Sequence, residues 1–426
     1  SLISADISLS MHIGLVLATA FISIATGLLA GIYPAYYMTS FPPALVLKGS
    51  FGLSPKGRQL RNALIGVQYV ASFGLIIGAT FMYLQNYYMQ NTPLGYDKDE
   101  IIITNMNNNI RKSRDAFASQ VKSFSGIEEV TYAEMLLSSQ DQYMGWGRKY
   151  RDKDIQFQCL PVEPSFLKVM NVKISEGRDF REEDKAKRYG TFVFNERART
   201  EYGLEIGSLI DSMEIVGFMP DVKFASFRTE VTPMAFFVWG TNNWGNQPNY
   251  AYIKVKAGSD LRGAMQHVKT TLQSFDPEYP FNVRFFDEVF NGLYEKERSL
   301  SSLITLFSLI AIFISVVGVF GLVVFDSEYR KKEIGIRKVL GSTTEEIIVM
   351  FNKTYIRILC VCFVLGAPIA GYVVHRWLEN FAYKTPMYWW VYLIAFAIIA
   401  VITILTVTFQ NWRAANENPV HSIKNE

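Results

Sequence analysis

The sequence predicts an α-helical membrane protein that carries a large α+β domain outside the membrane. Half of the 426 residues are hydrophobic. They gather into long uncharged runs near both ends of the chain, and an ordinary mixed sequence lies between these runs, from about 86 to 298. Because a bilayer core of about 30 Å requires roughly 20 apolar residues in a helix, the runs are long enough to span it. The net charge of the chain is small (+3), so it gives no reason to expect a nucleic-acid partner.

The apolar runs supply five candidate membrane spans, one near the beginning of the chain and four that form a separate unit. No Asp, Glu or Lys lies inside any of them, which argues against a proton or sodium pathway through this part of the protein. The expected spans are about 13–37, 62–84, 299–325, 354–374 and 387–409.

Basic residues predict the orientation of these spans. The loop between the first two spans contains Lys48, Lys56, Arg58 and Arg61 but no acidic residue. The loop between the third and fourth spans is also strongly basic, whereas the short connection at 375–386 is not. Since basic loops stay in the cytoplasm, the mixed region is expected on the outer side.

A weak internal repeat suggests that the chain is the C-terminal part of a longer, duplicated protein. When Pro43 is aligned with Pro419, Lys48 falls on Lys424, and both segments follow an inward-running span. The expected parts are a last span and tail of a preceding unit (1–50), a linker (51–61), a span and stalk helix (62–90), the outer domain (91–292) and a three-span region with a cytoplasmic helix (293–426).

The outer domain alternates strand-like and helix-like patterns, which predicts an α+β fold. Turn signals are expected at Gly145-Trp-Gly, Pro220-Asp and Asn242–Asn249. The expected strands are Glu100–Thr104, Glu128–Ala133, Phe157–Val162, Phe192–Phe194, Met213–Phe218, Met234–Trp239, Ala251–Lys256 and Val283–Phe286. The expected helices are Arg111–Phe124, Ser165–Met170, Glu196–Tyr202 and Leu261–Phe275.

The sequence offers no catalytic, cofactor or metal motif. It lacks the nucleophile elbow, the zinc-protease motif and the phosphate-binding loop. His267 is the one histidine of the outer domain and is expected at the surface of an amphipathic helix. The acidic run Glu182-Glu183-Asp184 stands among basic residues, as in a solvated loop. We therefore expect neither an enzyme nor a cofactor.

The second and third spans are expected to continue beyond the membrane as stiff helices. No proline occurs from Lys56 to Thr92, and a helix over 60–90 would be about 46 Å long. The third span can begin as early as Leu293. Gly74 and Gly78 form a G-x-x-x-G pattern that would allow close helix packing, although glycine is also frequent in membrane helices that make no such contact.

A short basic helix is expected in the loop that follows the third span. Ile336, Val339 and Leu340 share one face of it, Gly341 is a helix stop, and capping boxes at Ser342/Glu345 and Thr343/Glu346 begin the next helix. Two interpretations remain open: a helix lying on anionic lipid, and a helix that docks onto a cytoplasmic partner.

Several segments resemble the FtsX/MacB-type permeases of ABC transporters. "RKKEIGIRKVLGST" resembles the family's signature after the third span, and "NWRAANENPVHSIKNE" is similar to its C-terminal ending. "EGRDF", "FVFNERARTEYG" and "EIVGFMPDVKFASFRTEVTPMAFF" resemble its periplasmic core domain. "GFMPDVKF" departs from the family's more usual "GVVKDFHF".

The resemblance implies a permease subunit in a bacterial inner membrane, driven by a separate cytoplasmic ATPase pair. It also implies that the ATPase contacts one segment of the loop after the third span. That segment consists of Glu333, Ile334, Gly335, Ile336, Arg337, Lys338, Val339, Leu340 and Gly341. Movement of the outer domain would then export or extract an antimicrobial, a peptide or a lipoprotein. Membrane lipid, a second permease and a periplasmic adaptor are compatible further partners.

Two other classes of function compete with this expectation. A membrane sensor would need a cytoplasmic output domain, and the tail after Phe409 is too short to form one, so a partner would have to supply it. An outer-surface enzyme would need a catalytic cluster, which the motif search does not find.

Overall fold

The computed structural model describes residues 55–139, 143–242, 248–329, 336–337 and 340–415, together with parts of 13–28. The chain divides into two compact units. The helical unit comprises Ser1–Ile76, Leu306–Ile369 and Tyr392–Glu426. The α+β unit comprises Ile77–Thr305 and Ala370–Val391. Each long helix contributes residues to both units.

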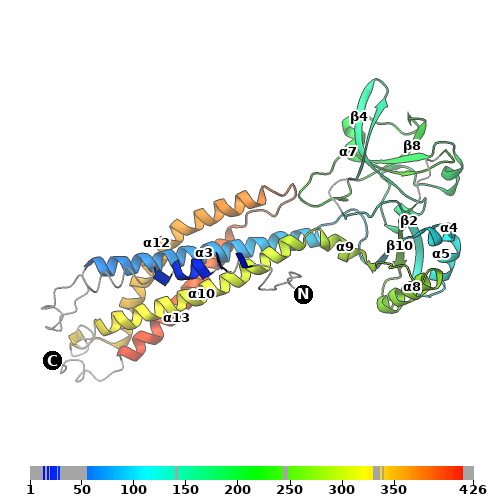
Figure 1. The fold of residues 1–426 in the computed structure, drawn as a ribbon. Coiled ribbons are helices and arrows are strands. Elements are labelled where there is room, and N and C mark those ends of the chain that lie inside the picture. The colour runs from blue at the N-terminus through cyan, green and yellow to red at the C-terminus, as the bar shows by residue number, and fades with distance from the viewer. Residues whose placement is uncertain are drawn as a thin grey trace. The chain divides into compact units, whose positions relative to one another are not determined.

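Four helices are long and apolar enough to cross a membrane among the described residues, as the sequence predicts. They are α3 (Pro55–Asn91), α10 (Glu295–Tyr329), α12 (Thr344–Leu378) and α13 (Trp389–Ala415), and they run along one another (Figure 1). The described residues within 13–28 are helical. Most of the expected first span lies outside the described residues, so that span stays a prediction.

Helix α3 is one uninterrupted helix of 37 residues, as its lack of internal proline predicts. At 1.5 Å per residue it is about 55 Å long. Pro55 stands at its first position, where a missing N–H costs nothing, and Thr92-Pro93 follows its last residue. The Thr92 N–H (3.0 Å) and hydroxyl (2.6 Å) both donate to the Tyr88 carbonyl, in the last turn of the helix.

Small and hydroxylated residues join the helices of the helical unit. The Tyr69 and Thr403 hydroxyls lie 3.0 Å apart, and those of Ser72 and Ser315 lie 2.8 Å apart. Such hydrogen bonds hold neighbouring helices together where no water is available. The Phe73 ring packs edge-on against Phe363 at 5.2 Å between centroids.

Among the described residues, Gly318 and Gly366 are glycines at which two helices come close together. A Cβ at Gly318 would lie 2.5 Å from Gln68 Oε1, and one at Gly366 would lie 3.3 Å from the Val70 backbone. A Cβ at Gly74 or Gly78 would meet nothing within 4 Å among the described atoms. The interface role of Gly74 and Gly78 therefore stays a prediction.

The first lobe of the α+β unit is a four-stranded sheet covered by helices. Its order is β11-β1-β10-β2, with every neighbouring pair antiparallel. Helices α4, α5 and α8 cover one face (Figure 1), where Phe117, Val121, Val268 and Leu272 are fully buried. The elements are β1 (Ile101–Asn105), α4 (Asn108–Lys112), α5 (Arg114–Lys122), β2 (Ile127–Ala133), β10 (Tyr250–Val255), α8 (Leu261–Phe275) and β11 (Val283–Phe285).

The second lobe is a mixed seven-stranded sheet. Its order is β3-β4-β9-β6-β8-β5, with β7 paired to β8. The strands are β3 (Met144–Tyr150), β4 (Lys153–Pro161), β5 (Glu176–Gly177), β6 (Thr191–Asn195), β7 (Leu209–Ile210), β8 (Met213–Met219) and β9 (Met234–Val238). The helical segments are α6 (Phe166–Val169), η1 (Glu182–Ala186) and α7 (Glu196–Tyr202), and α9 (Phe286–Gly292) leads from the first lobe toward α10.

Backbone hydrogen bonds join the two lobes. An antiparallel bridge pairs Ala133 with Val162. On either side of it, the Glu134 N–H donates to Pro161 O (3.1 Å) and the Glu163 N–H donates to Tyr132 O (3.0 Å). The end of β4 therefore continues the pairing of β2, and the lobes meet along a hydrogen-bonded strip.

The structure confirms most of the predicted elements of the α+β domain and corrects two. All eight predicted strands are present, and α7 and α8 begin and end at the predicted residues. The single helix predicted over Arg111–Phe124 is wrong, because Ser113 breaks it into α4 and α5. The turn predicted at Gly145-Trp-Gly is also wrong. These residues belong to β3, where Trp146 packs 4.8 Å from the Phe237 ring. Part of the turn predicted at Asn242–Asn249 lies outside the described residues.

The glycine contacts predict opposite effects for two matched substitutions. Gly366→Leu should lower the thermal midpoint of the detergent-solubilised chain, because overpacking against Val70 costs about 1–3 kcal/mol. Gly74→Leu should leave that midpoint unchanged or raise it, since no described atom lies within 4 Å of a Cβ at Gly74. Thermal unfolding is monitored by circular dichroism. An equal decrease of the midpoint in both variants would contradict this packing.

Candidate functional site

The segment 220–233, which connects β8 to β9, packs against three other segments of the α+β unit. These are the end of α3, the beginning of α10, and the connection 379–388 between α12 and α13. We call this contact the junction. It consists of Gln85, Tyr88, Phe227, Arg228, Tyr294, Glu297, Phe381 and Tyr383.

Phe227 lies at the centre of the junction and is fully buried. Its ring meets Tyr88 of α3 at 6.1 Å, Tyr294 at 6.2 Å and Tyr383 at 5.8 Å between centroids, in edge-to-face geometry. Each such pair contributes on the order of 1 kcal/mol beyond the burial of its area. One side chain therefore contacts three segments that are far apart in the sequence.

The Phe227 backbone is bonded to two of the same segments. Its N–H donates to the Tyr294 hydroxyl (2.9 Å), and its carbonyl accepts from the Tyr383 N–H (3.1 Å). The Tyr383 hydroxyl in turn accepts from the Val231 N–H (3.3 Å). These hydrogen bonds fix the register of the segment as well as its position.

Gln85 of α3 holds the connection 379–388 through both ends of its side-chain amide. Its Nε2 donates to Tyr383 O (3.0 Å), and its Oε1 accepts from the Thr385 N–H (2.8 Å). The side chain is fully buried. Because a buried amide is costly unless it is hydrogen-bonded, this pairing permits only one position of the connection along α3.

An ion pair joins the segment to α10. Arg228 contacts the Glu297 carboxylate, and the Glu297 side chain is only 5% exposed. The Arg228 guanidinium also lies over the Phe381 ring, 5.6 Å from its centroid. The Arg228 side chain is 51% exposed, so only the loss of Arg228 would leave a buried charge, that of Glu297, without compensation.

The far end of the segment is anchored in the core that the two lobes share. Phe224 O accepts from the Tyr143 hydroxyl (3.0 Å) and the Ser138 hydroxyl (3.2 Å), and Ser138 also contacts the Tyr96 hydroxyl. Burial raises the pKa of Tyr96 well above its ordinary value, so this hydroxyl stays neutral. The segment is thus held at one end by the sheets and at the other by the helix ends.

Lys223 adds a cation beside the aromatic cluster. Its ammonium lies 5.1 Å from the Tyr383 ring centroid and 5.7 Å from that of Phe227. It also donates to Pro93 O (3.3 Å), just beyond the end of α3. Desolvation by burial lowers the pKa of Lys223.

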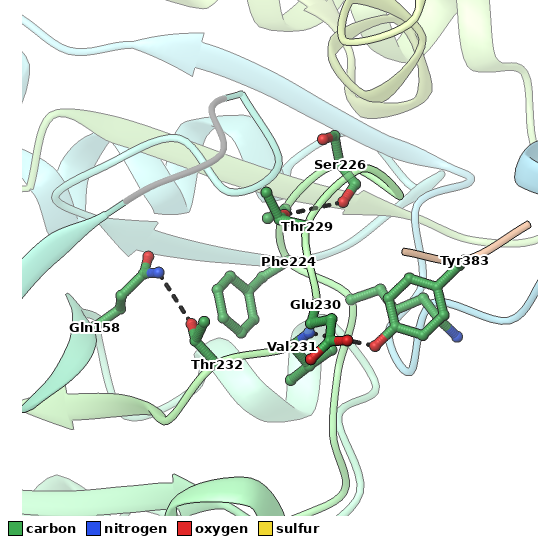
Figure 2. A pocket seen from close by; sticks show the side chains of 10 residues that line it. Gln158, Phe224, Ser226, Thr229, Glu230, Val231, Thr232 and Tyr383 are labelled. Carbon is green, nitrogen blue, oxygen red and sulfur yellow. Dashed lines mark hydrogen bonds between the residues drawn. The ribbon is translucent and has the colours of Figure 1, made fainter. Parts of the chain in front are cut away.

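The pocket at the junction is too small for an organic ligand. Its volume is about 70 Å³, well below the range typical of small-molecule sites. Figure 2 shows its lining, in which Val231, Thr232 and Tyr383 make hydrogen bonds to the protein itself. Within the described residues, no cluster of His, Cys, Asp and Glu could hold a metal. The arrangement suits mechanical connection better than chemistry.

The structure describes only part of the predicted ATPase-contacting helix. Glu333, Ile334, Gly335, Lys338 and Val339 lie outside the described residues. The structure describes the other four members, Ile336, Arg337, Leu340 and Gly341.

Ile336 and Leu340 are 55% and 80% exposed, so both apolar side chains face outward. Gly341 has a φ of +96°, and the Ser342 N–H donates to Arg337 O (2.9 Å). The Thr343/Glu346 capping box is confirmed by its two reciprocal hydrogen bonds (3.3 and 3.2 Å).

Sequence reasoning missed the junction entirely. Its signals were two aromatic residues in a loop, Phe224 and Phe227, and a glutamine, Gln85, in the stalk helix. These residues do not identify the partners that they contact, because all of the partners are distant in sequence. His267 is partly buried, within the predicted range of a surface or boundary residue, with its Nε2 3.0 Å from Gln120 O and its ring stacked on Phe124.

Two family models match the chain in consecutive regions. The MacB-like periplasmic core domain matches residues 64–271, and the FtsX-like permease C-terminal domain matches residues 305–419. The fold agrees with this order, since an α+β unit precedes the last three long helices along the chain. The class of protein is therefore a multi-span membrane protein with a periplasmic-type domain.

Curated relatives are similar over the same part of the chain. The macrolide export ATP-binding/permease protein MacB of Chromobacterium violaceum is 23% identical over 230 residues, covering 51% of this chain and 35% of the relative. MacB of Escherichia coli K12 is 22% identical over 233 residues, with the same coverage. The chain thus spans about a third of the length of these relatives.

One similar solved structure is the periplasmic region of MacB from Actinobacillus actinomycetemcomitans. The match covers 47% of this chain and 94% of the solved chain, at 14% sequence identity and a TM-score of 0.34. The two family matches identify the chain as an FtsX-like permease with a MacB-like periplasmic core domain, the permease type of ABC transporters.

The junction predicts that Phe227 protects the connection 379–388 from proteolysis. In Phe227→Ala, a loss of about 3 kcal/mol or more should open the connection and accelerate trypsin cleavage after Lys384 by on the order of a hundredfold. Tyr87→Ala, which removes an exposed ring from the same stalk, is the matched control and should cleave like the parent chain. Unchanged cleavage in folded Phe227→Ala would show that Phe227 does not hold the connection.

Proposed function

We propose that this chain is the permease subunit of a bacterial inner-membrane transporter and that it relays the motion of a separate cytoplasmic ABC ATPase to its periplasmic domain. The family matches support the class of permease. The junction is the observation that supports the relay, because it fastens the periplasmic lobes to three helix ends at once.

The relay begins with helices that do not bend easily. Helix α3 has 37 residues and no internal proline, and α10 has 35. Each contributes residues to both units. A displacement at the cytoplasmic end of such a helix reaches its other end, whereas a flexible linker would absorb it. Gln85 and Glu297 then pass it to the connection 379–388 and to the segment 220–233.

The substrate is one that has already reached the outer side of the inner membrane. The relatives are named for macrolide export, and this chain shares only part of their length. Antimicrobial compounds, peptides and lipoproteins all fit a permease that moves its periplasmic domain. Export and extraction remain alternatives within the proposal, and ATP hydrolysis belongs to the partner subunit.

The ATPase grips the segment Glu333–Gly341 in this proposal. The exposed apolar side chains of Ile336 and Leu340 support it, since an ATPase groove would cover them. The Gly341 turn and the Thr343/Glu346 capping box connect this segment directly to α12. A push on the segment therefore acts on the helix that leads to the connection 379–388.

Substitutions in this segment separate ATPase docking from lipid binding. Gly335→Trp and Arg337→Glu should each weaken co-purification of the ATPase and uncouple its hydrolysis from transport, while membrane insertion stays intact. Lys353→Glu makes the same charge change on the exposed face of α12 and is the control. Lipid binding, which responds to total charge, predicts equal effects of Arg337→Glu and Lys353→Glu and none of Gly335→Trp. That pattern would remove the docking proposal.

The proposed orientation is tested by labelling single cysteines in a background that lacks Cys159, Cys360 and Cys362. Ser259→Cys should react with an impermeant maleimide in cells whose outer membrane is permeabilised. Ser342→Cys should react only after the inner membrane is opened. Labelling of Ser342→Cys in cells whose inner membrane is intact would contradict the proposed topology.

A further inference from the structure

A charged cleft of the α+β unit lies where its two lobes meet, away from the junction. Its volume is about 460 Å³, within the range of small-molecule sites. The first lobe lines it with Arg111, Arg114 and Tyr132 among others, and the second with Lys185 and Trp239 among others. The hydrogen-bonded strip between Ala133 and Val162 forms its floor.

The lining of this interlobe cleft is positively charged. Four cationic side chains face two carboxyls, which leaves a formal excess of two positive charges when both carboxyls are ionised; the six are Arg111, Lys112, Arg114, Lys185, Glu134 and Glu163. Excess charge of one sign in a concave surface concentrates ligands of the opposite sign.

Arg111 has a structural role in the cleft. Its guanidinium donates to Pro248 O (3.1 Å) and Met106 O (3.2 Å), and it also bonds the Asn249 side chain. It therefore holds the edge of the cleft in place and contributes a fixed charge.

Arg114 and Lys185 meet across the cleft on a single carboxylate. Arg114 Nη1 lies 2.6 Å from Glu163 Oε1, and Lys185 Nζ lies 2.5 Å from Glu163 Oε2. Arg114 comes from the first lobe, whereas Lys185 and Glu163 come from the second. Both cations remain accessible, with 37% and 43% of their side chains exposed. Lys185 also pairs with Glu182 Oε2 (3.1 Å). The N–H groups of Arg114 and Lys185 that these carboxylates leave free can take a second anion.

Glu134 supplies an acceptor that the protein leaves unused. Its Oε2 is buried and has no hydrogen-bond partner among the described residues. Burial also raises the pKa of Glu134. A buried polar atom without a partner is unfavourable, and a bound molecule with a donor at this point would satisfy it.

Aromatic surface completes the lining. Arg114 lies over the Tyr132 ring (5.9 Å to the centroid), and the half-buried Trp239 packs on Phe237 at 4.7 Å. These rings belong to opposite lobes and are fixed by their own packing. They offer a rigid apolar surface beside the cations.

We propose that the interlobe cleft binds a small anionic ligand whose carboxylate or phosphate pairs with Arg114 and Lys185 while an adjoining apolar group lies along Tyr132 and Trp239. This proposal goes beyond the relay and does not depend on it, because it concerns binding to the periplasmic domain whatever drives the domain's movement. Since the site uses residues from both lobes, the bound ligand also braces the lobes against each other.

Binding is measured by ligand-observed NMR on the full chain in lipid nanodiscs, with probes that differ in charge. Phenylacetate and phenyl phosphate carry the two candidate anions, and phenylacetamide is the neutral match. At least one anion should bind about fivefold or more tightly than the amide, and the tighter of the two identifies the anionic group. Equal binding of all three probes, or none, overturns the proposal.

Variants locate the binding in the cleft. Arg114→Gln and Lys185→Gln should each weaken anion binding about fivefold. Glu163→Gln removes the competing internal carboxylate and should tighten binding by a similar factor, an outcome that misfolding could not imitate. Arg151→Gln removes an exposed arginine of the same unit that lies outside the cleft and should have no effect. Weaker binding in Glu163→Gln, or equal losses in Arg151→Gln and Arg114→Gln, would contradict the site.

Discussion

The contact between Phe227 and Tyr383 holds the connection 379–388 against the two lobes of the α+β unit, and the rest of the junction depends on it. The lobes are joined covalently to α3 at one end and to α10 through α9 at the other. The connection 379–388 has no such link to the lobes and is held by packing and hydrogen bonds alone. The ring contact at 5.8 Å and the backbone hydrogen bond at 3.1 Å supply its centre. Without them the lobes would be connected to α3 and α10 but not to the connection between α12 and α13.

Buried polar groups make this contact specific as well as stable. Apolar packing around Phe227 would tolerate small slips, because dispersion and hydrophobic burial have little directionality. Gln85 and the Arg228–Glu297 pair do not tolerate them, since each slip would strand a buried amide or charge. The helical unit follows the same principle, with the Tyr69–Thr403 and Ser72–Ser315 hydrogen bonds fixing helix positions that apolar side chains leave open.

The sequence predicts local structure here much better than tertiary contacts. Span positions follow from runs of apolar residues, and α3 follows from the absence of proline, so both were predictable. Trp146 shows the limit: flanked by glycines it resembles a turn, yet its packing on Phe237 draws the segment into β3. The close helix contacts at Gly318 and Gly366 were missed because glycine spacing does not say which residue faces a neighbour. The junction and the interlobe cleft combine residues from distant segments, and no local pattern contains them.

The central claim is that ATPase motion reaches the periplasmic domain through the junction. It is tested most directly by double electron–electron resonance, which measures the distance between two spin labels. The labels are attached at Ser125→Cys in the α+β unit and Lys353→Cys on α12, in the complex with the ATPase. The account predicts that ATP shifts this distance distribution in the parent chain. In Phe227→Ala the shift should be lost although ATP hydrolysis continues. An identical shift in both proteins would contradict the account, because the motion would then bypass the junction.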